Sequence, residues 1–319
     1  MRRHLRAWGS LIAAAVTLPY LVWRLGTGPF LDGIRTIDGT ALAAATGLVV
    51  LTTVGSAWRW KIVARNLGVE LSLPAAVAAY YRSLFLNVTL PVGVAGDLHR
   101  GVSHGRDVGD VGRGLRSVVW ERTAGQAVQA VVTVAVLLAL PSPVQSAMPL
   151  VTVALVVAVC AVVLLTRARP SGARSWPARI RRAVAGDVRD GLLARKSWLG
   201  IALVSALVLA GHVVTFLIAA RTAGIAAPLS RMLPIALLVM LTTTLPGLGS
   251  WGPREGATAW LFSAAGLGAR GGIATGVVYA VMVLVASLPG AGVLVVAWFR
   301  RPGPPERTEP PLARATANV

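Results

Sequence analysis

A group of charged and polar residues follows a Gly- and Pro-rich break at residues 90–97, next to a long apolar segment. The group comprises Asp97, His99 and Arg100. A turn with several glycines lets backbone N–H groups face a ligand, and a guanidinium can hold a phosphate through two parallel hydrogen bonds. These residue types therefore favour an anion site with Arg100 as the phosphate ligand. The alternative is an ordinary Asp–Arg ion pair at the cytoplasmic surface.

A second acid–base pair, Glu121 and Arg122, stands at the start of the next long apolar stretch. Both residue types suit a site for a charged ligand. The alternative is structural, because a carboxylate is favourable at a helix N-terminus and an arginine at a helix end fixes the orientation of the helix in a membrane. The sequence leaves these two interpretations open.

A third pair, Arg254 and Glu255, follows a Gly- and Pro-rich break at residues 245–253. Residues 232–253 contain no charged side chain, so we expect the pair to lie at membrane depth. Ionisable residues are costly there and are candidates for function by default. The alternative is that the two charges neutralise each other and only close the turn.

A further arginine, Arg82, lies in the apolar segment before the first break, where it needs a carboxylate or a lipid phosphate as a partner. Asp97 and Glu121 are the candidate partners. The four histidines are scattered, and neither a Cys/His cluster nor a Walker motif occurs, so we expect no catalytic residue, metal site or cofactor, and no enzyme activity. The candidate substrate-binding residues are Arg82, Asp97, Arg100, Glu121, Arg122, Arg254 and Glu255.

Long uncharged stretches indicate which elements position these residues. Of the 319 residues, 55% are hydrophobic and 13% are charged, whereas a soluble domain has about 25% charged residues. A helix needs about 20 apolar residues to cross a bilayer, and several stretches reach that length. The sequence therefore predicts an all-α polytopic membrane protein. Its six transmembrane helices are expected at about 8–25, 39–58, 117–140, 147–166, 198–220 and 273–299.

The net charge of +19 comes from cations that stand mostly at the ends of the apolar stretches. Lys and Arg in that position mark cytoplasmic loops, so nucleic acid is not an expected partner. Arg59, Lys61 and Arg65 fit such a loop, and the segment 167–197 has a strong excess of arginine. We expect both termini to be cytoplasmic, the protein to reside in the plasma membrane, and the tail 301–319 to be disordered.

Two segments, 71–112 and 229–268, remain between the predicted spans, and each contains a Leu-Pro break. Broken helices at membrane depth are typical of re-entrant hairpins, which begin and end on one side of the membrane. The first hairpin is expected to enter from the inside and the second from the outside. Counting the hairpins as spans would give eight apolar segments.

The order of elements recurs along the chain. The two Leu-Pro breaks are 155 residues apart, and the predicted helices before and after them recur at an offset of about 159. Corresponding helices run in opposite directions, which predicts an inverted-topology repeat, the plan of many secondary transporters. Residues 1–300 would form one membrane domain, with one repeat at about 8–140 and the other at about 147–299. The alternative is that the two hairpins serve packing alone.

Three motifs follow one another along the chain: RSLFLNVTLPVGVAGDLHRG at 82–101, SVVWERTAG at 117–125 and TLPGLGSWGPREGA at 244–257. Over roughly residues 10–300 the sequence resembles the lysylphosphatidylglycerol synthase transmembrane-region family, also described as flippase-like. The departures are Ala95 in a turn that is Gly-Gly-Asp in the family, and a Trp and a Pro in the later Gly-x-Gly-x-Arg-Glu motif. Synthases of that family have a soluble catalytic domain after the membrane part, and the 20 residues after position 299 are too few to hold one.

The resemblance implies a flippase-like protein that binds and translocates a phospholipid or a lipid-linked anionic substrate. Arg100, Arg122 and Arg254 would then hold the anionic head group, and the carboxylates would pair with these arginines or with a cationic head group. The alternatives are a lipid-modifying enzyme subunit and a scaffold that presents lipids to a separate synthase or glycosyltransferase. Membrane lipids are the expected partners in each case.

Overall fold

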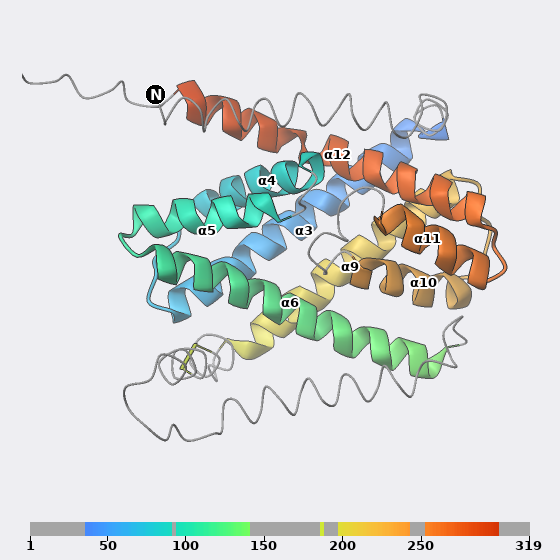
Figure 1. Cartoon of the computed structure of the whole chain (residues 1–319), viewed down its shortest axis with the longest axis horizontal. Coiled ribbons are helices and arrows are strands. Elements are labelled where there is room, and N and C mark those ends of the chain that lie inside the picture. The colour runs from blue at the N-terminus through green and yellow to red at the C-terminus, as the bar shows by residue number, and fades with distance from the viewer. Residues whose placement is uncertain (1–35, 91–93, 141–185, 188–196, 243–252, 300–319) are drawn as a thin grey trace, which may run out of the picture.

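The computed structural model describes residues 36–90, 94–140, 186–187, 197–242 and 253–299, and these residues form helices joined by short loops (Figure 1). No strand occurs in these ranges. The helices are α3 (Gly39–Asn66), α4 (Leu73–Thr89), α5 (Ala95–Asp107), α6 (Val111–Ala139), α9 (Trp198–Thr222), α10 (Leu229–Thr242), α11 (Pro253–Ala264) and α12 (Ala269–Phe299).

Four of these helices, α3, α6, α9 and α12, are long and apolar enough to cross a membrane. They contain 28, 29, 25 and 31 residues, and a span needs about 20. The prediction of an all-α polytopic membrane protein is therefore confirmed. The expected spans at 8–25 and 147–166, and the tail 301–319, lie outside the described residues.

Two helix boundaries differ from the predicted ones. Helix α3 continues to Asn66 instead of ending at residue 58, because Arg59 is buried against a carboxylate of the helix bundle and does not end the helix. Helix α6 begins at Val111 instead of residue 117, since the Asp110 side chain caps it by accepting a 2.8 Å hydrogen bond from the N–H of Arg113. Glu121 and Arg122 consequently lie in the third turn of α6, and not at its start.

Pairs of shorter helices occupy both segments predicted as hairpins. Helix α4 ends immediately before the first Leu-Pro break, as expected for a residue that precedes proline, and α5 begins a few residues later. The two helices approach closely at Gly96, where an added Cβ would collide with the backbone carbonyl of Ser83. Helices α10 and α11 flank the second break in the same order. Whether these pairs are re-entrant in a membrane stays a prediction.

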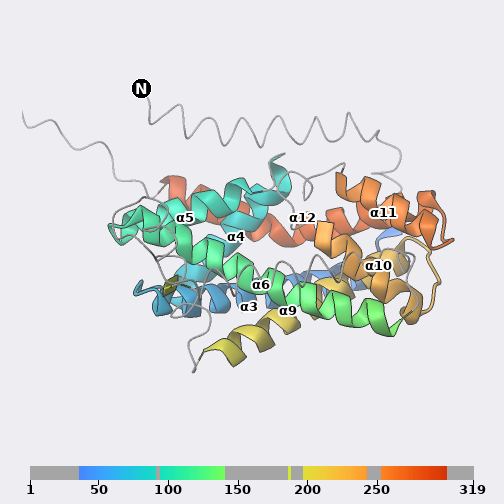
Figure 2. The ribbon, with the colours of Figure 1, turned by 60° about the horizontal axis from the view of Figure 1, so that its bottom comes forward.

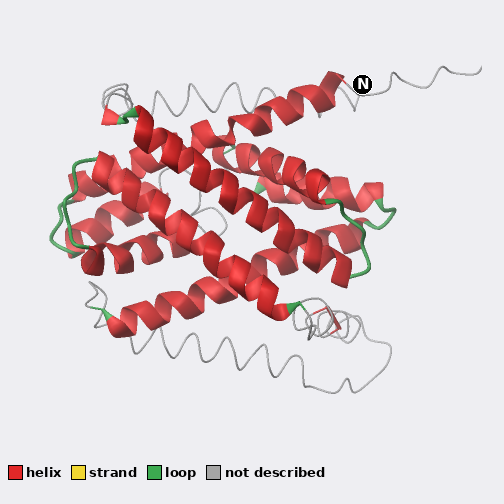
Figure 3. Cartoon of the chain, turned by 180° about the vertical axis from the view of Figure 1, so that it is seen from behind, coloured by secondary structure: helices red, strands yellow, loops and turns green. Residues whose placement is uncertain are grey.

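Helices α3 and α9 lie side by side at the centre of the molecule (Figures 1 and 3). Their contacts show that they are antiparallel: Gly200, near the start of α9, faces Trp58, near the end of α3, and Gly211 faces Thr52. Helix α12 and the α4–α5 pair lie together on one side of these two helices (Figure 2).

The packing partners follow one scheme in both halves. Helix α4 packs on α3, α5 and α12, whereas α10 packs on α9, α11 and α6. Helix α5 packs on α6, and α11 packs on α12. The helices of the two halves correspond in chain order, α3 to α9, α4 to α10, α5 to α11 and α6 to α12. Each contact between two helices recurs between their two counterparts; the contact of α4 with α12, for example, corresponds to that of α10 with α6. The described helices of the two halves thus share one set of neighbour relations, and whether the halves form an inverted-topology repeat stays a prediction.

The central helices end in matching caps. Gly68 follows α3 with φ of 74° and Gly224 follows α9 with φ of 81°, a backbone conformation that glycine adopts without steric cost. The next residue in each case, Val69 or Ile225, donates its N–H to a carbonyl five residues earlier, at 2.9 Å in both. These are Schellman-type caps, so the same local structure ends both helices.

Candidate functional site

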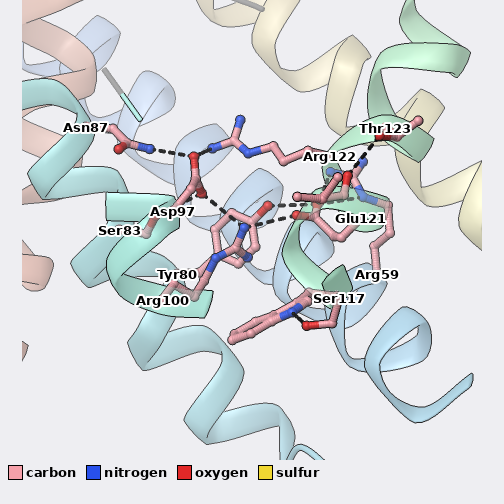
Figure 4. A network of polar contacts seen from close by, with 12 residues as sticks. Arg59, Tyr80, Ser83, Asn87, Asp97, Arg100, Ser117, Glu121, Arg122 and Thr123 are labelled. Carbon is pink, nitrogen blue, oxygen red and sulfur yellow. Dashed lines mark hydrogen bonds and ion pairs between the residues drawn. The ribbon is translucent and has the colours of Figure 1, made fainter. Parts of the chain in front are cut away.

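Glu121 is the centre of a buried polar network between α3, α4, α5 and α6 (Figure 4). Its side chain is fully buried and accepts hydrogen bonds from Arg59 Nε at 2.9 Å and from Tyr80 Oη at 2.9 Å. Arg59 Nη2 also contacts the same carboxylate oxygen, and Arg100 Nη2 lies 3.1 Å from the other. Three side chains from three different helices therefore depend on one carboxylate.

Asp97, in the first turn of α5, is the second carboxylate of the network. It accepts hydrogen bonds from Ser83 Oγ and Asn87 Nδ2, both at 3.0 Å, and from Arg100 Nη2 at 3.0 Å and Arg122 Nη2 at 2.5 Å (Figure 4). Burial by itself would raise the pKa of Asp97, but the charges of Arg122 and Arg100 outweigh it and lower the pKa to about 2. Asp97 is therefore ionised at neutral pH.

Asn87 of α4 forms two hydrogen bonds to α5 and so connects the two helices of the first pair. Its Nδ2 donates to Asp97, and its Oδ1 accepts a 2.8 Å hydrogen bond from the backbone N–H of Gly96, at the start of α5. An amide that satisfies both groups fixes the N-terminus of α5 against the end of α4. This is a local structural reason for the Asn that precedes the Leu-Pro break.

Arg100 bridges the two carboxylates and is fully buried. Its guanidinium carbon lies 4.0 Å from the ring centroid of Tyr80 and 4.5 Å from that of Trp60, both cation–π distances. The Trp60 indole is held in turn by a 3.0 Å hydrogen bond to Ser117 Oγ. Enclosed in this way, Arg100 is less accessible than Arg122, whose side chain is 44% exposed, and its role as a phosphate ligand stays a prediction.

The network contains three guanidinium groups, from Arg59, Arg100 and Arg122, and two carboxylates. It therefore has one positive charge in excess. Buried charges need partners, and removal of one partner from such a pair is strongly destabilising. The excess charge is stabilised best by an anion at the most accessible arginine.

A cavity of about 250 Å³ adjoins the network between α3, α4, α6, α9 and α12. Arg59 and Arg122 both contribute to its wall, and the Arg122 side chain is 44% exposed whereas that of Arg59 is 6% exposed. The described residues of the wall include no Asp or Glu. Arg122 is consequently the guanidinium that a ligand in this cavity can reach.

The cavity is amphipathic. Hydroxyl and amide side chains on α3 and α6 form part of its wall, and His212 of α9 also contributes. Apolar side chains, among them Leu209, Met240 and Val283, form another part. Such a lining suits a ligand with both a charged head and an apolar body.

The structure brings four of the seven predicted site residues together, namely Asp97, Arg100, Glu121 and Arg122. Arg82 lies on α4 outside this network; its Nε is buried without a hydrogen-bond partner among the described residues. Neither Asp97 nor Glu121 is bonded to it, since both already accept from other arginines.

The other two predicted residues, Arg254 and Glu255, belong to the first turn of α11. Their side chains lie outside the described part of the structure. A binding role for this pair therefore stays a prediction.

Arg59 and Tyr80 belong to the network but were not among the predicted residues. The sequence interprets Arg59 with Lys61 and Arg65 as a cytoplasmic marker and gives it no place in the site, whereas its side chain is buried and donates to Glu121 and to Ser205 Oγ at 3.0 Å. The available signal was spacing: Thr52, Ser56 and Arg59 lie four and three residues apart, on one face of a helix.

Comparison with known families agrees with the resemblance of the motifs. The sequence model of the family described as "Lysylphosphatidylglycerol synthase TM region" matches residues 7–290, most of the chain. No curated protein and no solved structure matches the chain. The chain belongs to the lysylphosphatidylglycerol synthase transmembrane-region family.

Proposed function

We propose that this protein binds a phospholipid or a lipid-linked anionic substrate in the cavity between α3, α4, α6, α9 and α12 and translocates it across the plasma membrane. The observation that carries the proposal is the charge of the cavity. Two guanidinium groups, those of Arg59 and Arg122, lie in its wall, and its described residues include no carboxylate. Membership of a lipid-related membrane family supports the same substrate class.

Arg122 is the primary anion ligand in this proposal. Its Nη2 is engaged by Asp97, and its other N–H groups have no partner among the described residues. Asp97 therefore orients the guanidinium and leaves donors for a lipid phosphate, which guanidinium groups bind in a forked geometry. The apolar part of the wall accepts the hydrocarbon next to the phosphate.

Translocation requires that the cavity open to each side in turn. The matching neighbour relations of the α4–α5 and α10–α11 pairs, on either side of antiparallel α3 and α9, suit alternating access by two related halves. The proposed orientation has both termini in the cytoplasm. Movement is downhill or coupled to an ion, since the sequence contains no ATP-binding motif.

A flip assay tests the proposal. Purified protein is reconstituted into liposomes with a fluorescent phosphatidylglycerol, and loss of inner-leaflet protection is followed with a membrane-impermeant quencher. The wild-type protein is expected to accelerate flipping over protein-free vesicles, and Arg122→Gln to abolish most of the acceleration. The matched control is Arg231→Gln, which removes an exposed cation of α10 away from the cavity.

The same assay separates translocation from the alternatives. A scaffold that presents lipids to a separate synthase or glycosyltransferase would bind the labelled lipid in an Arg122-dependent way without accelerating its flip. A lipid-modifying subunit would change the head group, which mass spectrometry of the recovered lipid detects. No acceleration by the wild-type protein overturns the translocation proposal.

A further inference from the structure

One face of α6 is polar along the cavity. Arg122, Gln126, Gln129 and Thr133 follow one another at spacings of four, three and four residues, so they lie on one side of the helix. Arg122, Gln126 and Gln129 all contribute to the cavity wall. Polar side chains therefore continue from the arginine along the cavity for two helical turns.

These side chains contain polar atoms without partners. Gln126 Oε1, Gln129 Nε2 and Thr133 Oγ1 are buried and make no hydrogen bond to the described residues. A buried amide or hydroxyl without a hydrogen bond destabilises a protein, and most native polar groups avoid it. Apolar side chains would pack at these positions without that cost. Because Gln126 and Gln129 also line the cavity, a ligand in the cavity can supply the missing partners of their amides.

The chemistry of the two glutamines defines that partner. An amide has one acceptor oxygen and one donor nitrogen, and its terminal torsion turns easily, so each glutamine can both donate and accept. A hydroxyl group, which also donates and accepts, matches both functions. An ammonium group does not match, because it only donates and because Arg59 and Arg122 would repel it.

We infer that the head group of the substrate is an uncharged, hydroxyl-bearing group, such as a glycerol or a sugar, attached to the lipid phosphate. Gln126 and Gln129 bind its hydroxyls while Arg122 binds the phosphate. The inference rests on the proposed function and specifies its substrate class. It also excludes lipids whose head group has a net positive charge, although the family is described by a synthase of such a lipid.

Equilibrium binding to the full chain in detergent micelles tests the inference. The probes are fluorescent phosphatidylglycerol and phosphatidylethanol with identical acyl chains. Both have the same phosphodiester charge, and only the first has hydroxyl groups. Two additional hydrogen bonds are expected to make phosphatidylglycerol bind about tenfold more tightly. The double variant Gln126→Leu/Gln129→Leu is expected to lose this preference and to keep its affinity for phosphatidylethanol.

A control variant and a stability measurement exclude a merely structural role for the glutamines. Thr123→Val removes an exposed hydroxyl on the same helix, whose Oγ1 donates to Val119 at 2.9 Å, and should leave the preference unchanged. The melting temperature of the double glutamine variant should equal or exceed that of the wild type, because two unpaired amides are removed. A lower melting temperature together with an unchanged preference would overturn the inference.

Other results would also overturn it, and they are distinguishable from failure of the proposed function. Equal affinity of the wild-type protein for the two probes contradicts the hydroxyl-bearing head group and leaves the proposed binding of anionic lipids intact. Tighter binding of lysyl-phosphatidylglycerol than of phosphatidylglycerol contradicts the hydroxyl-bearing head group and also brings the binding of anionic lipids into question. Absence of binding for both anionic probes contradicts the proposed function itself.

Discussion

The two halves of the molecule use the same neighbour relations between helices, and their described residues fill these relations with different side chains. Around α4 and α5 the interior contains the charges of Asp97, Arg100 and Glu121. Around α10 and α11 the described buried side chains are largely apolar and aromatic, with Phe216 packed against both Phe262 and Tyr279. This difference between the described residues predicts a division of tasks, in which one half contains the charged network and the other supplies an apolar support.

The largest expected effect comes from the centre of the charged half. Glu121→Gln removes the carboxylate that Arg59, Tyr80 and Arg100 share. Two buried guanidinium groups are left with fewer partners, so we expect a loss of about 4 kcal/mol in the free energy of unfolding. Denaturation in mixed micelles measures this loss. A change below about 0.5 kcal/mol, the size typical of a surface substitution, would show that the network does not stabilise this half.

The corresponding change in the apolar half is Phe262→Ala. Phe262 is fully buried and contacts Phe216 edge-on, with ring centroids 6.4 Å apart. The cavity left behind should cost about 3 kcal/mol. Binding of an anionic lipid to the folded variant should match the wild type. A strong loss of lipid affinity in this variant would contradict the division of tasks between the halves.

Glycines at close helix contacts allow a comparison of the two halves, between α4 and α5 in the first and between α11 and α12 in the second. An added Cβ at Gly96 would collide with the backbone of Ser83, and one at Gly272 would lie 2.7 Å from the carbonyl of Thr258. Each alanine variant should therefore cost about 2 kcal/mol by forcing two helices apart. Gly47→Ala, where the added atom meets open space, is the control. In binding assays only Gly96→Ala should weaken lipid affinity, because Gly96 precedes Asp97.

A smaller effect is expected for Asn87→Ala. The substitution removes one hydrogen bond to Asp97 and one to the N–H of Gly96, at the start of α5. Loss of such a cap should cost about 1 kcal/mol. Thermal unfolding measures the change. The variant Asn87→Asp keeps an acceptor for the N–H of Gly96 but places a second carboxylate beside Asp97. It should therefore lower the stability more than Asn87→Ala does. The opposite order would show that the cap outweighs the charge repulsion.

The sequence predicted the fold class and both helix pairs, because apolar length and Leu-Pro breaks are local features. It also predicted Asp97, Arg100, Glu121 and Arg122 as site residues, since ionisable groups beside apolar stretches are conspicuous. The sequence did not predict which of these residues are accessible to a ligand and which are enclosed. Arg100 is enclosed by aromatic rings while Arg122 is accessible, and only the packing of α3 and α4 on α5 produces that difference.

Arg59 shows a second limit. An arginine at the end of an uncharged stretch fits a cytoplasmic anchor as well as a buried partner of a carboxylate. The choice depends on Glu121, which is 62 residues away in the chain and adjacent in space. The sequence also did not predict Gln126 and Gln129, the proposed head-group ligands, since neutral amides inside a long apolar helix give little signal in charge or hydropathy.

The glycine caps of α3 and α9 have a consequence for how this protein can diverge. A residue with positive φ is restricted to glycine whatever fills the interior nearby, so Gly68 and Gly224 are constrained independently of the substrate. Interior side chains have no such restriction and can exchange charge for apolar volume in one half alone. Variants selected for a new cavity lining should therefore retain both glycines, because the two caps end helices and do not line the cavity.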